Sequence, residues 1–394
     1  MAHLPDQRRA AQRRGRARKR GAARNLRALD ALRGGLALYV LLGHARWLLW
    51  AGHAEWLRQP HAFWELPLAY ASAGLRFGHE AVMVFFVLSG FFIHLRAAEQ
   101  LAAGRPATCP PGRFYQRRWH RLGVPFLAAL GLTLALDLVG QACFPRLYLA
   151  QTGDALLDAN FARKGYTLES VLPALLLLPT SLGHDFGTNG PLWSLAFEVV
   201  YYTAYPLWLA VRRRSGLAAG GLGVAGAVLG AGGWLPGFLG GVLLHYPLWL
   251  AGAFLAELAS RPAGFDRVRW AVLLAPALIL PSFLRLPALA MTALYLVGGL
   301  AVVLAFARLP VRFSESGIGR SAEYLGLRSY TIYICHFPML VLLSAWVIQT
   351  QGGRPLSGWL AVAGSGVALG GCLAAFHAAE RHYVHARLEL PKSP

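Results

Sequence analysis

The sequence predicts an all-α polytopic membrane protein, with about ten transmembrane helices in one bundle and both termini in the cytoplasm. Three observations lead to this fold class. The chain of 394 residues is 56% hydrophobic and only 14% charged, which leaves too few polar side chains to cover a soluble domain. Apolar stretches of roughly 20 residues, each long enough to cross a bilayer, recur along the chain. Lysine and arginine gather in alternate connections, as they do in cytoplasmic loops.

The apolar stretches follow one another from residue 29 to residue 377. We predict spans at residues 29–50, 79–95, 122–142, 191–211, 216–234, 239–259, 270–284, 287–307, 329–348 and 358–377. The seventh stretch is short and contains Pro276 and Pro281, and proline interrupts helical hydrogen bonding. A further apolar run at residues 171–179 is bounded by prolines and is too short to cross, so we expect an interfacial or re-entrant helix there.

The basic residues define the ends of the chain. Residues 1–27 hold ten Arg or Lys against the single acid Asp6. Such a segment has little apolar surface to bury, so we predict a disordered cytoplasmic tail that sets the topology and binds no nucleic acid. A ten-helix membrane domain over residues 28–380 and a second cytoplasmic tail over residues 381–394 complete the domain prediction. We expect the protein to lie in the inner (cytoplasmic) membrane of the cell.

The first span carries two ionisable residues, Arg33 and His44. They are eleven positions apart, which is about three helical turns, so their side chains share one face roughly 16 Å apart along the axis. Ionisable groups at membrane depth usually face a cavity and mark a functional site. The alternatives are an Arg33 side chain that reaches back to the interface and a His44 hydrogen bond between helices. We interpret the pair as a candidate site.

The fourth span carries a carboxylate, Glu198, which is costly inside a membrane and therefore indicates function. Tyr202 lies one turn after Glu198 and Ser194 one turn before it, so the three side chains share a helical face. Because this span enters from the outer surface, we expect Glu198 near that surface, where an acceptor would arrive. Four cysteines without metal-ligand spacing predict no metal site.

Polar side chains also recur in the ninth span, where Ser329, Tyr333 and His336 form a stripe along one face. Such a stripe either joins helices or lines a site. In the second span, Ser89 and Gly90 favour a kink or a close helix crossing, with a ligand contact by Ser89 as the second interpretation.

Before the third span, Arg118 and Arg121 are three residues apart and share a helical face. They act either as charges that stop membrane transfer or as a clamp for a phosphate-bearing donor, to which the rigid fork of arginine is suited.

Five stretches of this chain, taken together, resemble the acyltransferase-3 family of integral membrane O-acyltransferases. They occur in the family's order over about residues 25–390, nearly the whole chain. They are residues 31–34 with His44, residues 85–91, Arg118 and Arg121 before Pro125, residues 192–195 with Glu198 and Tyr202, and residues 329–330 with Tyr333, His336 and Pro338. Many members of the family carry an acidic residue where this chain has Met83, so we assign no functional role to that position.

The resemblance implies a ten-helix enzyme that transfers an acyl group, other than an aminoacyl group, from cytoplasmic acyl-coenzyme A. The expected reaction is O-acetylation of an envelope glycan, such as lipopolysaccharide or exopolysaccharide, on the outer side. Acyl-coenzyme A is then a co-substrate, and no permanently bound cofactor is expected. The family's important arginine and histidine correspond to Arg33 and His44, its carboxylate to Glu198, and its cytoplasmic arginine pair to Arg118 and Arg121. We add Ser89, Tyr202, Tyr333 and His336 as candidate substrate-binding residues.

The chemistry of these residue types agrees with acyl transfer. A neutral His44 is suited to act as a general base towards a hydroxyl group, and a covalent acyl-histidine intermediate is the alternative. Arg33 would bind the phosphates of coenzyme A or stabilise charge on the thioester oxygen. Glu198 and Tyr202 would orient the acceptor, or Glu198 would raise the basicity of a histidine.

Two other functions fit parts of the sequence. Within the same class, the acceptor is instead a small glycosylated natural product. A transporter would also place polar residues on several spans, but the stretch around Arg33 has no counterpart in the second half of the chain. A purely structural protein leaves the helical spacing of the ionisable residues unexplained.

Overall fold

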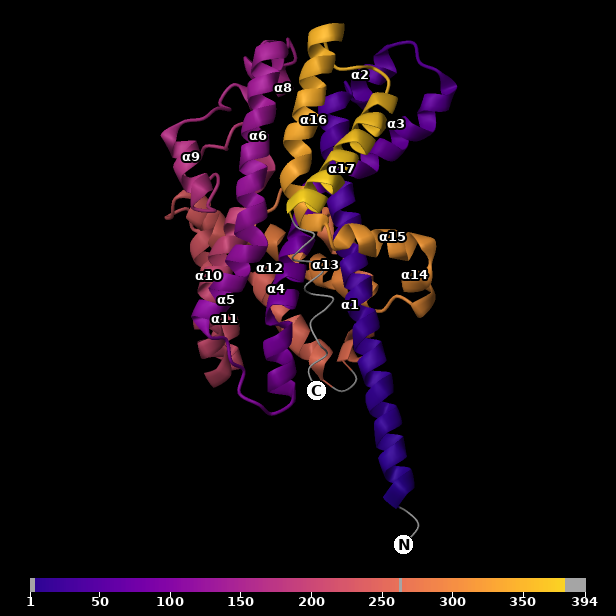
Figure 1. Cartoon of the computed structure of the whole chain (residues 1–394), viewed down its shortest axis with the longest axis vertical. Coiled ribbons are helices and arrows are strands. Elements are labelled where there is room, and N and C mark those ends of the chain that lie inside the picture. Colours follow the sequence, from indigo (N-terminus) through magenta and orange to yellow (C-terminus); the bar gives the residue numbers. More distant parts are fainter. Residues whose placement is uncertain (1–3, 262–263, 380–394) are drawn as a thin grey trace.

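The computed structural model describes residues 4–261 and 264–379, with side chains over residues 26–261, 270–310 and 312–377. Figure 1 shows an elongated assembly of helices, with the N-terminal part of α1 extending below the rest. Within the described residues there is no β-strand, and the only β-type pairing is an isolated bridge between Gly165 and Phe186. The all-α fold predicted from the sequence is therefore confirmed for this part of the chain.

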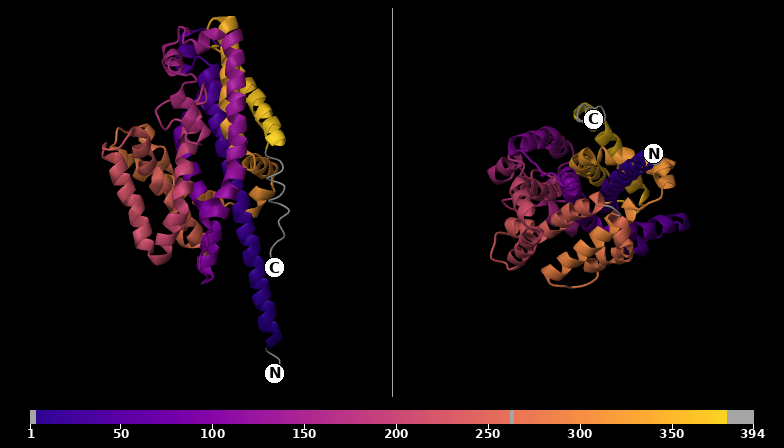
Figure 2. Two further views of the ribbon diagram at one scale, coloured as in Figure 1. Left: turned by 60° about the vertical axis from the view of Figure 1, so that its left-hand side comes forward. Right: turned by 90° about the horizontal axis from the view of Figure 1, so that it is seen from below.

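Eight long helices form the body of the molecule. They are α1 (Leu4–Leu49), α4 (Gly78–Ala102), α6 (Val124–Cys143), α10 (Trp193–Arg214), α12 (Gly237–Ser260), α13 (Ala288–Ala307), α16 (Ser329–Gln351) and α17 (Trp359–Ala379). Helix α1 lies alongside both α16 and α17 (Figures 1 and 2).

Shorter elements connect these helices. Those before α10 are α2 (His53–Arg58), η1 (Phe63–Glu65), α3 (Leu66–Ala73), η2 (Gly74–Arg76), α5 (Pro111–Arg118), the π-helical turn η3 (Trp119–Gly123), α7 (Pro145–Tyr148), α8 (Ala155–Phe161), α9 (Leu168–Leu175) and η4 (Gly190–Leu192). Those after it are α11 (Gly216–Ala231), η5 (Gly264–Leu278), η6 (Leu280–Ser282), α14 (Val311–Glu315) and α15 (Gly317–Gly326).

The molecule is a multi-pass membrane protein. Of the helices in the described residues, 6 are long and apolar enough to cross a bilayer: α4, the continuous segment from α5 to α6, α12, α13, α16 and α17. The predicted first and fourth spans are also helical, but their ionisable residues lower the hydropathy of α1 and α10. Helix α11 has 16 residues, fewer than the roughly 20 that a crossing needs. The expected number of about ten crossings thus stays a prediction.

The predicted seventh span, residues 270–284, is not an α-helix. The chain there forms the 3₁₀-helical elements η5 and η6, and η5 lies against α13. Pro276 and Pro281 supply no backbone N–H group for helical bonding, which explains why the regular α-helical pattern is not maintained. The prolines were visible in the sequence, but the resulting helix type was not.

The N-terminal segment also differs from the prediction of a disordered tail over residues 1–27. Helix α1 begins at Leu4 and continues without a break to Leu49. Alanine and arginine, which dominate this segment, are among the residues with the highest helix propensity. The tail predicted for residues 381–394 lies outside the described residues.

The long connection between α6 and α10 is folded against the bundle. Its helix α9 has 8 residues, so the apolar run at residues 171–179 does not cross a membrane, as predicted. Asp137 on α6 anchors the connection: its carboxylate accepts hydrogen bonds from the Tyr166 hydroxyl at 2.7 Å and from the Thr188 amide and hydroxyl at 2.9 and 2.7 Å. The connection is thereby held against α6.

Helices α4 and α12 cross at very short distance. A Cβ atom at Gly90 would overlap the backbone carbonyl of Trp249, and one at Gly252 would overlap the carbonyl of Val87. Only glycine permits such an approach. The close crossing that the sequence favoured for residues 89–90 is confirmed, and it leaves the side chain of Ser89 directed into a cavity between helices.

Candidate active site

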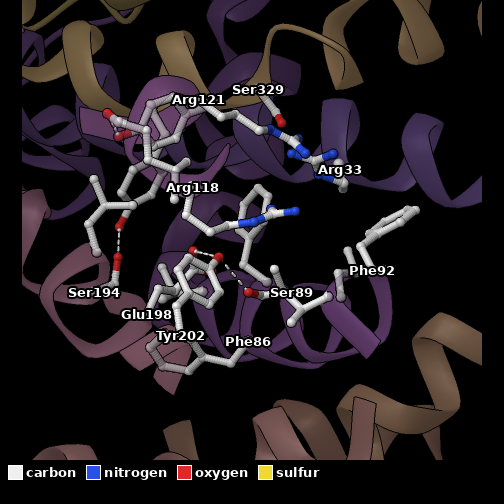
Figure 3. Close-up of a pocket in the computed structure, with 18 residues that line it drawn as sticks. Arg33, Phe86, Ser89, Phe92, Arg118, Arg121, Ser194, Glu198, Tyr202 and Ser329 are labelled. Atoms are coloured by element: carbon white, nitrogen blue, oxygen red, sulfur yellow. Dashed lines mark hydrogen bonds between the residues drawn. The ribbon is translucent and has the colours of Figure 1, made fainter. Parts of the chain in front are cut away.

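A cavity with an empty volume of about 790 Å³ lies among α1, α4, α5, η3, α10 and α16. Most of the sequence-predicted site residues line it, together with Ser194, Ser329, Tyr330 and several apolar side chains of α4. The predicted residues among them are Arg33, Ser89, Arg118, Arg121, Glu198, Tyr202 and Tyr333. We call this space the arginine cavity. In Figure 3, Arg33, Arg118 and Arg121 lie on one side of it and Ser89, Glu198 and Tyr202 on the other.

Three separate elements supply the arginines. Arg33 comes from α1, where its guanidinium lies 5.5 Å from the ring centre of Phe92 and 3.5 Å from the carboxylate of Asp30. Arg118 ends α5 and lies 5.6 Å from the ring centre of Phe114, and Arg121 belongs to the π-helical turn η3.

The π-helical turn has a local cause in the sequence. Pro125 follows it and cannot donate to the carbonyl of Arg121, which explains why the chain departs from α-helical bonding at this point. The outcome is a cavity wall with three fixed positive charges facing a single carboxylate, Glu198. Such a surface is suited to bind phosphate groups.

Glu198 ends a chain of hydrogen bonds whose direction is fixed by the donors available. The Tyr202 hydroxyl donates its only proton to Glu198 at 2.5 Å, so the Ser89 hydroxyl must donate to Tyr202 at 2.8 Å. The indole N–H of Trp249 in turn donates to Ser89 at 3.2 Å. These hydrogen-bonded side chains lie opposite the arginines, and Glu198 lines the arginine cavity whereas His44 does not.

A second cavity, with an empty volume of about 1050 Å³, lies beyond the arginine cavity. We call it the histidine cavity because His44 and His79 both line it. Aromatic side chains and two polar residues of the long connection complete much of its wall. These residues are Trp47, Phe161, Trp193, Phe337, Asn160 and Lys164. Lys164 is paired with Asp185, which compensates its charge.

His44 is paired with a second histidine from α16. Its Nδ1 atom lies 2.8 Å from Nε2 of His336, and Nδ1 of His336 lies 2.8 Å from the carbonyl oxygen of Ile332. The two rings are nearly parallel, with an angle of 8° and centroids 5.1 Å apart. His336, which the sequence predicted to bind substrate, is fully buried and lines neither of the two cavities.

Two residues, Val82 and Tyr333, line both cavities. The Tyr333 hydroxyl donates to the carbonyl of Pro191 at 3.0 Å and accepts from Ser194 at 2.7 Å. These bonds hold the tyrosine ring in place between the arginine cavity and the histidine cavity. The two spaces therefore meet at a wall made by one aliphatic and one aromatic side chain.

Sequence reasoning missed most of the histidine cavity. Neither His79 nor Trp193, which both line this cavity, was among the predicted site residues. Lys164 carries no local signal, because the long connection brings it to the cavity through tertiary contacts. Within the described residues, no group of three or more His, Cys, Asp or Glu side chains could hold a metal ion.

Comparison with known families adds one finding. The acyltransferase-3 family model, described as an acyltransferase domain, matches residues 26–377. This match includes every residue named above in either cavity. No curated protein and no solved structure matches the chain.

Proposed function

The chain belongs to the acyltransferase-3 family, and from that membership we propose that it transfers an acetyl group from cytoplasmic acyl-coenzyme A to a hydroxyl group across the inner membrane. The proposed acceptor is an envelope glycan, such as lipopolysaccharide or exopolysaccharide. The observation that carries the proposal is the meeting of two unlike cavities at Val82 and Tyr333. One is rich in arginine and the other in histidine and aromatic side chains, as a donor site and an acceptor site would be.

The arginine cavity is the proposed donor site. Coenzyme A carries several phosphate groups, which the planar forks of Arg33, Arg118 and Arg121 can bind through paired N–H groups. Arg33 and His44 are roughly 16 Å apart along α1, too far for both to act on one thioester carbonyl. This separation supports phosphate binding, rather than stabilisation of the thioester oxygen, as the role of Arg33.

The histidine cavity is the proposed acceptor site. Trp47 and Trp193 offer flat apolar faces for a sugar ring, while Asn160 and Lys164 offer hydrogen-bond donors. Because Lys164 is already paired with Asp185, the cavity does not require a charged acceptor. A neutral sugar hydroxyl next to His44 fits these surroundings.

The proposed reaction is direct transfer. His44 takes the proton of the acceptor hydroxyl as its oxygen attacks the thioester carbonyl carbon. A carbon–oxygen bond forms, the carbon–sulfur bond breaks, and coenzyme A leaves as a thiolate that receives a proton from the histidine. General base catalysis of this kind contributes about 10² to 10⁴ to the rate.

Radiolabelled acetyl-coenzyme A and the purified protein in lipid nanodiscs test this proposal. With isolated envelope polysaccharide as acceptor, we expect label on the polysaccharide and free coenzyme A in equal amounts. His44→Ala should lower both by about 10² or more, whereas His377→Ala, on an exposed residue of α17 that lines neither cavity, should not. Full transfer by His44→Ala would refute the assigned base. Label on a small glycoside but not on polysaccharide would favour the natural-product acceptor.

A further inference from the structure

The hydrogen bonds of His336 determine which of its nitrogens carries a proton. A backbone carbonyl can only accept, so the bond of 2.8 Å between Nδ1 of His336 and the Ile332 oxygen requires a proton on Nδ1. A neutral imidazole has one protonated nitrogen, and a neutral ring avoids the cost of burying a charge. Nε2 of His336 therefore carries a lone pair.

The same reasoning extends to His44. Its Nδ1 atom lies 2.8 Å from Nε2 of His336, and since that atom is an acceptor, Nδ1 of His44 must be the donor. The proton of His44 then lies on Nδ1, and its Nε2 is the nitrogen with a lone pair. His44 lines the histidine cavity, so this lone pair belongs to the residue that faces the proposed acceptor.

We infer that His336 is a positioning residue that fixes His44 in the Nδ1-protonated tautomer and thereby makes Nε2 of His44 the general base. This inference rests on the proposed function for the role of His44, but the tautomer itself does not. The opposite tautomer of His44 would bring two lone pairs together at the His336 contact, and it would present an N–H group to a hydroxyl whose proton must be removed.

The surroundings keep this arrangement in place. His336 is fully buried, and its carbonyl partner belongs to the preceding turn of α16, so its own helix sets its orientation. Phe337 packs edge-on against the His44 ring at 5.0 Å between centroids. Neither ring can turn without losing both the parallel ring contact and a buried hydrogen bond.

Two substitutions of His336 separate positioning from mere packing. His336→Met keeps a side chain of similar length but offers only a weak acceptor, its thioether sulfur, to the N–H group of His44. We expect kcat to fall by about 10² to 10⁴, the contribution that a correctly protonated general base makes, with the KM for acetyl-coenzyme A unchanged. His336→Gln can donate to Ile332 and accept from His44, so it should recover most of kcat.

Ser344→Ala is the matched control. Ser344 is buried on α16, and its hydroxyl donates to the Leu48 carbonyl at 2.8 Å, so it also joins α16 to α1. This variant loses a bond between the same two helices without touching either histidine. We expect a similar change in thermal stability but an unaltered kcat. If Ser344→Ala lowers kcat as much as His336→Met, or if His336→Met keeps the wild-type kcat, the positioning role is wrong.

Nitrogen-15 NMR of histidine-labelled protein in nanodiscs reads the tautomer without any turnover. The His44 signals are identified by their absence in His44→Ala, and we expect a protonated Nδ1 and an unprotonated Nε2 in the wild type and in Ser344→Ala. A protonated Nε2 in the wild type would overturn the inference even if acyl transfer is observed. The expected tautomer in a protein that transfers no acyl group would instead refute the proposed function alone.

Discussion

The hydroxyl groups of Tyr202 and Tyr333 are each held in one orientation, because a tyrosine hydroxyl has a single proton to donate. Tyr202 donates to Glu198 and therefore only accepts from Ser89. Tyr333 donates to the Pro191 carbonyl and only accepts from Ser194. Side chains held in this way do not need to reorganise when a ligand arrives, which favours binding and catalysis.

The cavity arginines should determine the affinity for the donor. A hydrogen bond to a charged group contributes about 1.5 to 3 kcal/mol, so we expect Arg118→Ala and Arg121→Ala each to raise the Kd of coenzyme A by about 10-fold to 100-fold. Isothermal titration calorimetry of the protein in nanodiscs measures this constant. Arg105→Ala is the control, since Arg105 is exposed in the preceding loop and lines neither cavity. If all three variants bind coenzyme A with the same Kd, Arg118 and Arg121 do not bind the donor and act only as charges that set the membrane topology.

The wall between the cavities should determine the size of the acyl group. Val82 is one of the two residues that both cavities share, so Val82→Ala widens the point at which the thioester meets the acceptor. We expect the ratio of kcat/KM for butanoyl-coenzyme A to that for acetyl-coenzyme A to rise several-fold, and Val82→Phe to lower kcat/KM for both. Val84→Ala, a buried position on α4 that lines neither cavity, should leave the ratio unchanged. An unaltered ratio in Val82→Ala would mean that the acyl group passes elsewhere.

Among the elements, α16 shows how an interrupted helix organises its neighbours. Pro338 has no N–H group, so the carbonyl of Ile334 one turn earlier is left without its helical donor. The amide of Asn189 supplies one at 2.9 Å and also donates to the Thr133 hydroxyl at 3.0 Å. A proline within α16 thus joins that helix to α6 and to the segment that leads into α10, next to Ser194 and Glu198.

The long connection before α10 should depend on Asp137. Its carboxylate accepts three hydrogen bonds while almost fully buried, and Asp137→Asn would set an N–H group against one of these donors. We expect a loss of about 1 to 3 kcal/mol in the free energy of unfolding and faster proteolysis within residues 150–190. Limited proteolysis and thermal unfolding in nanodiscs measure these effects.

Glu169→Gln is the control for this change. Glu169 forms an exposed pair with His184 in the same connection, and exposed pairs contribute little to stability. Equal protease sensitivity of the two variants would show that Asp137 does not anchor the connection.

On the scale of the whole molecule, the helices enclose two cavities that share a wall within one bundle. The arginine cavity draws its charges from α1, α5 and η3, and the histidine cavity draws its lining from α1, α4, α10, α16 and the connection after α6. The proposed transfer across the membrane then needs no large movement of one half of the bundle against the other. This arrangement differs from that of transporters, in which two repeats rock around a central site.

The orientation in the membrane is tested by accessibility. The connection between α4 and α5 contains Arg105, and the adjoining helical ends contain Arg96, Arg113, Arg117 and Arg118. We therefore predict that this connection is cytoplasmic and that α8 lies outside. In a background with the four cysteines replaced, a membrane-impermeant maleimide on intact spheroplasts should label Leu156→Cys and should label Ala103→Cys only after permeabilisation. Both positions are exposed. The reverse pattern would invert the assignment of donor and acceptor sides.

The sequence by itself determined the helical class, the membrane location and most of the polar residues around the arginine cavity. Hydropathy and helical periodicity are local properties, so the spacing of Ser194, Glu198 and Tyr202 is enough to assign these three side chains to one helical face. The family resemblance rested on the same stretches, which the match over residues 26–377 confirms.

Only the tertiary structure decided which faces meet. The pairing of His44 with His336 joins residues 292 positions apart, Glu198 lies with the arginines and not with His44, and Lys164 reaches the histidine cavity through a folded connection. The spacing of polar residues in the sequence shows which face of a helix is polar. It does not show which other helix that face will contact. That choice depends on close packing between helices, such as the glycine crossing of α4 and α12, and packing depends on the whole chain.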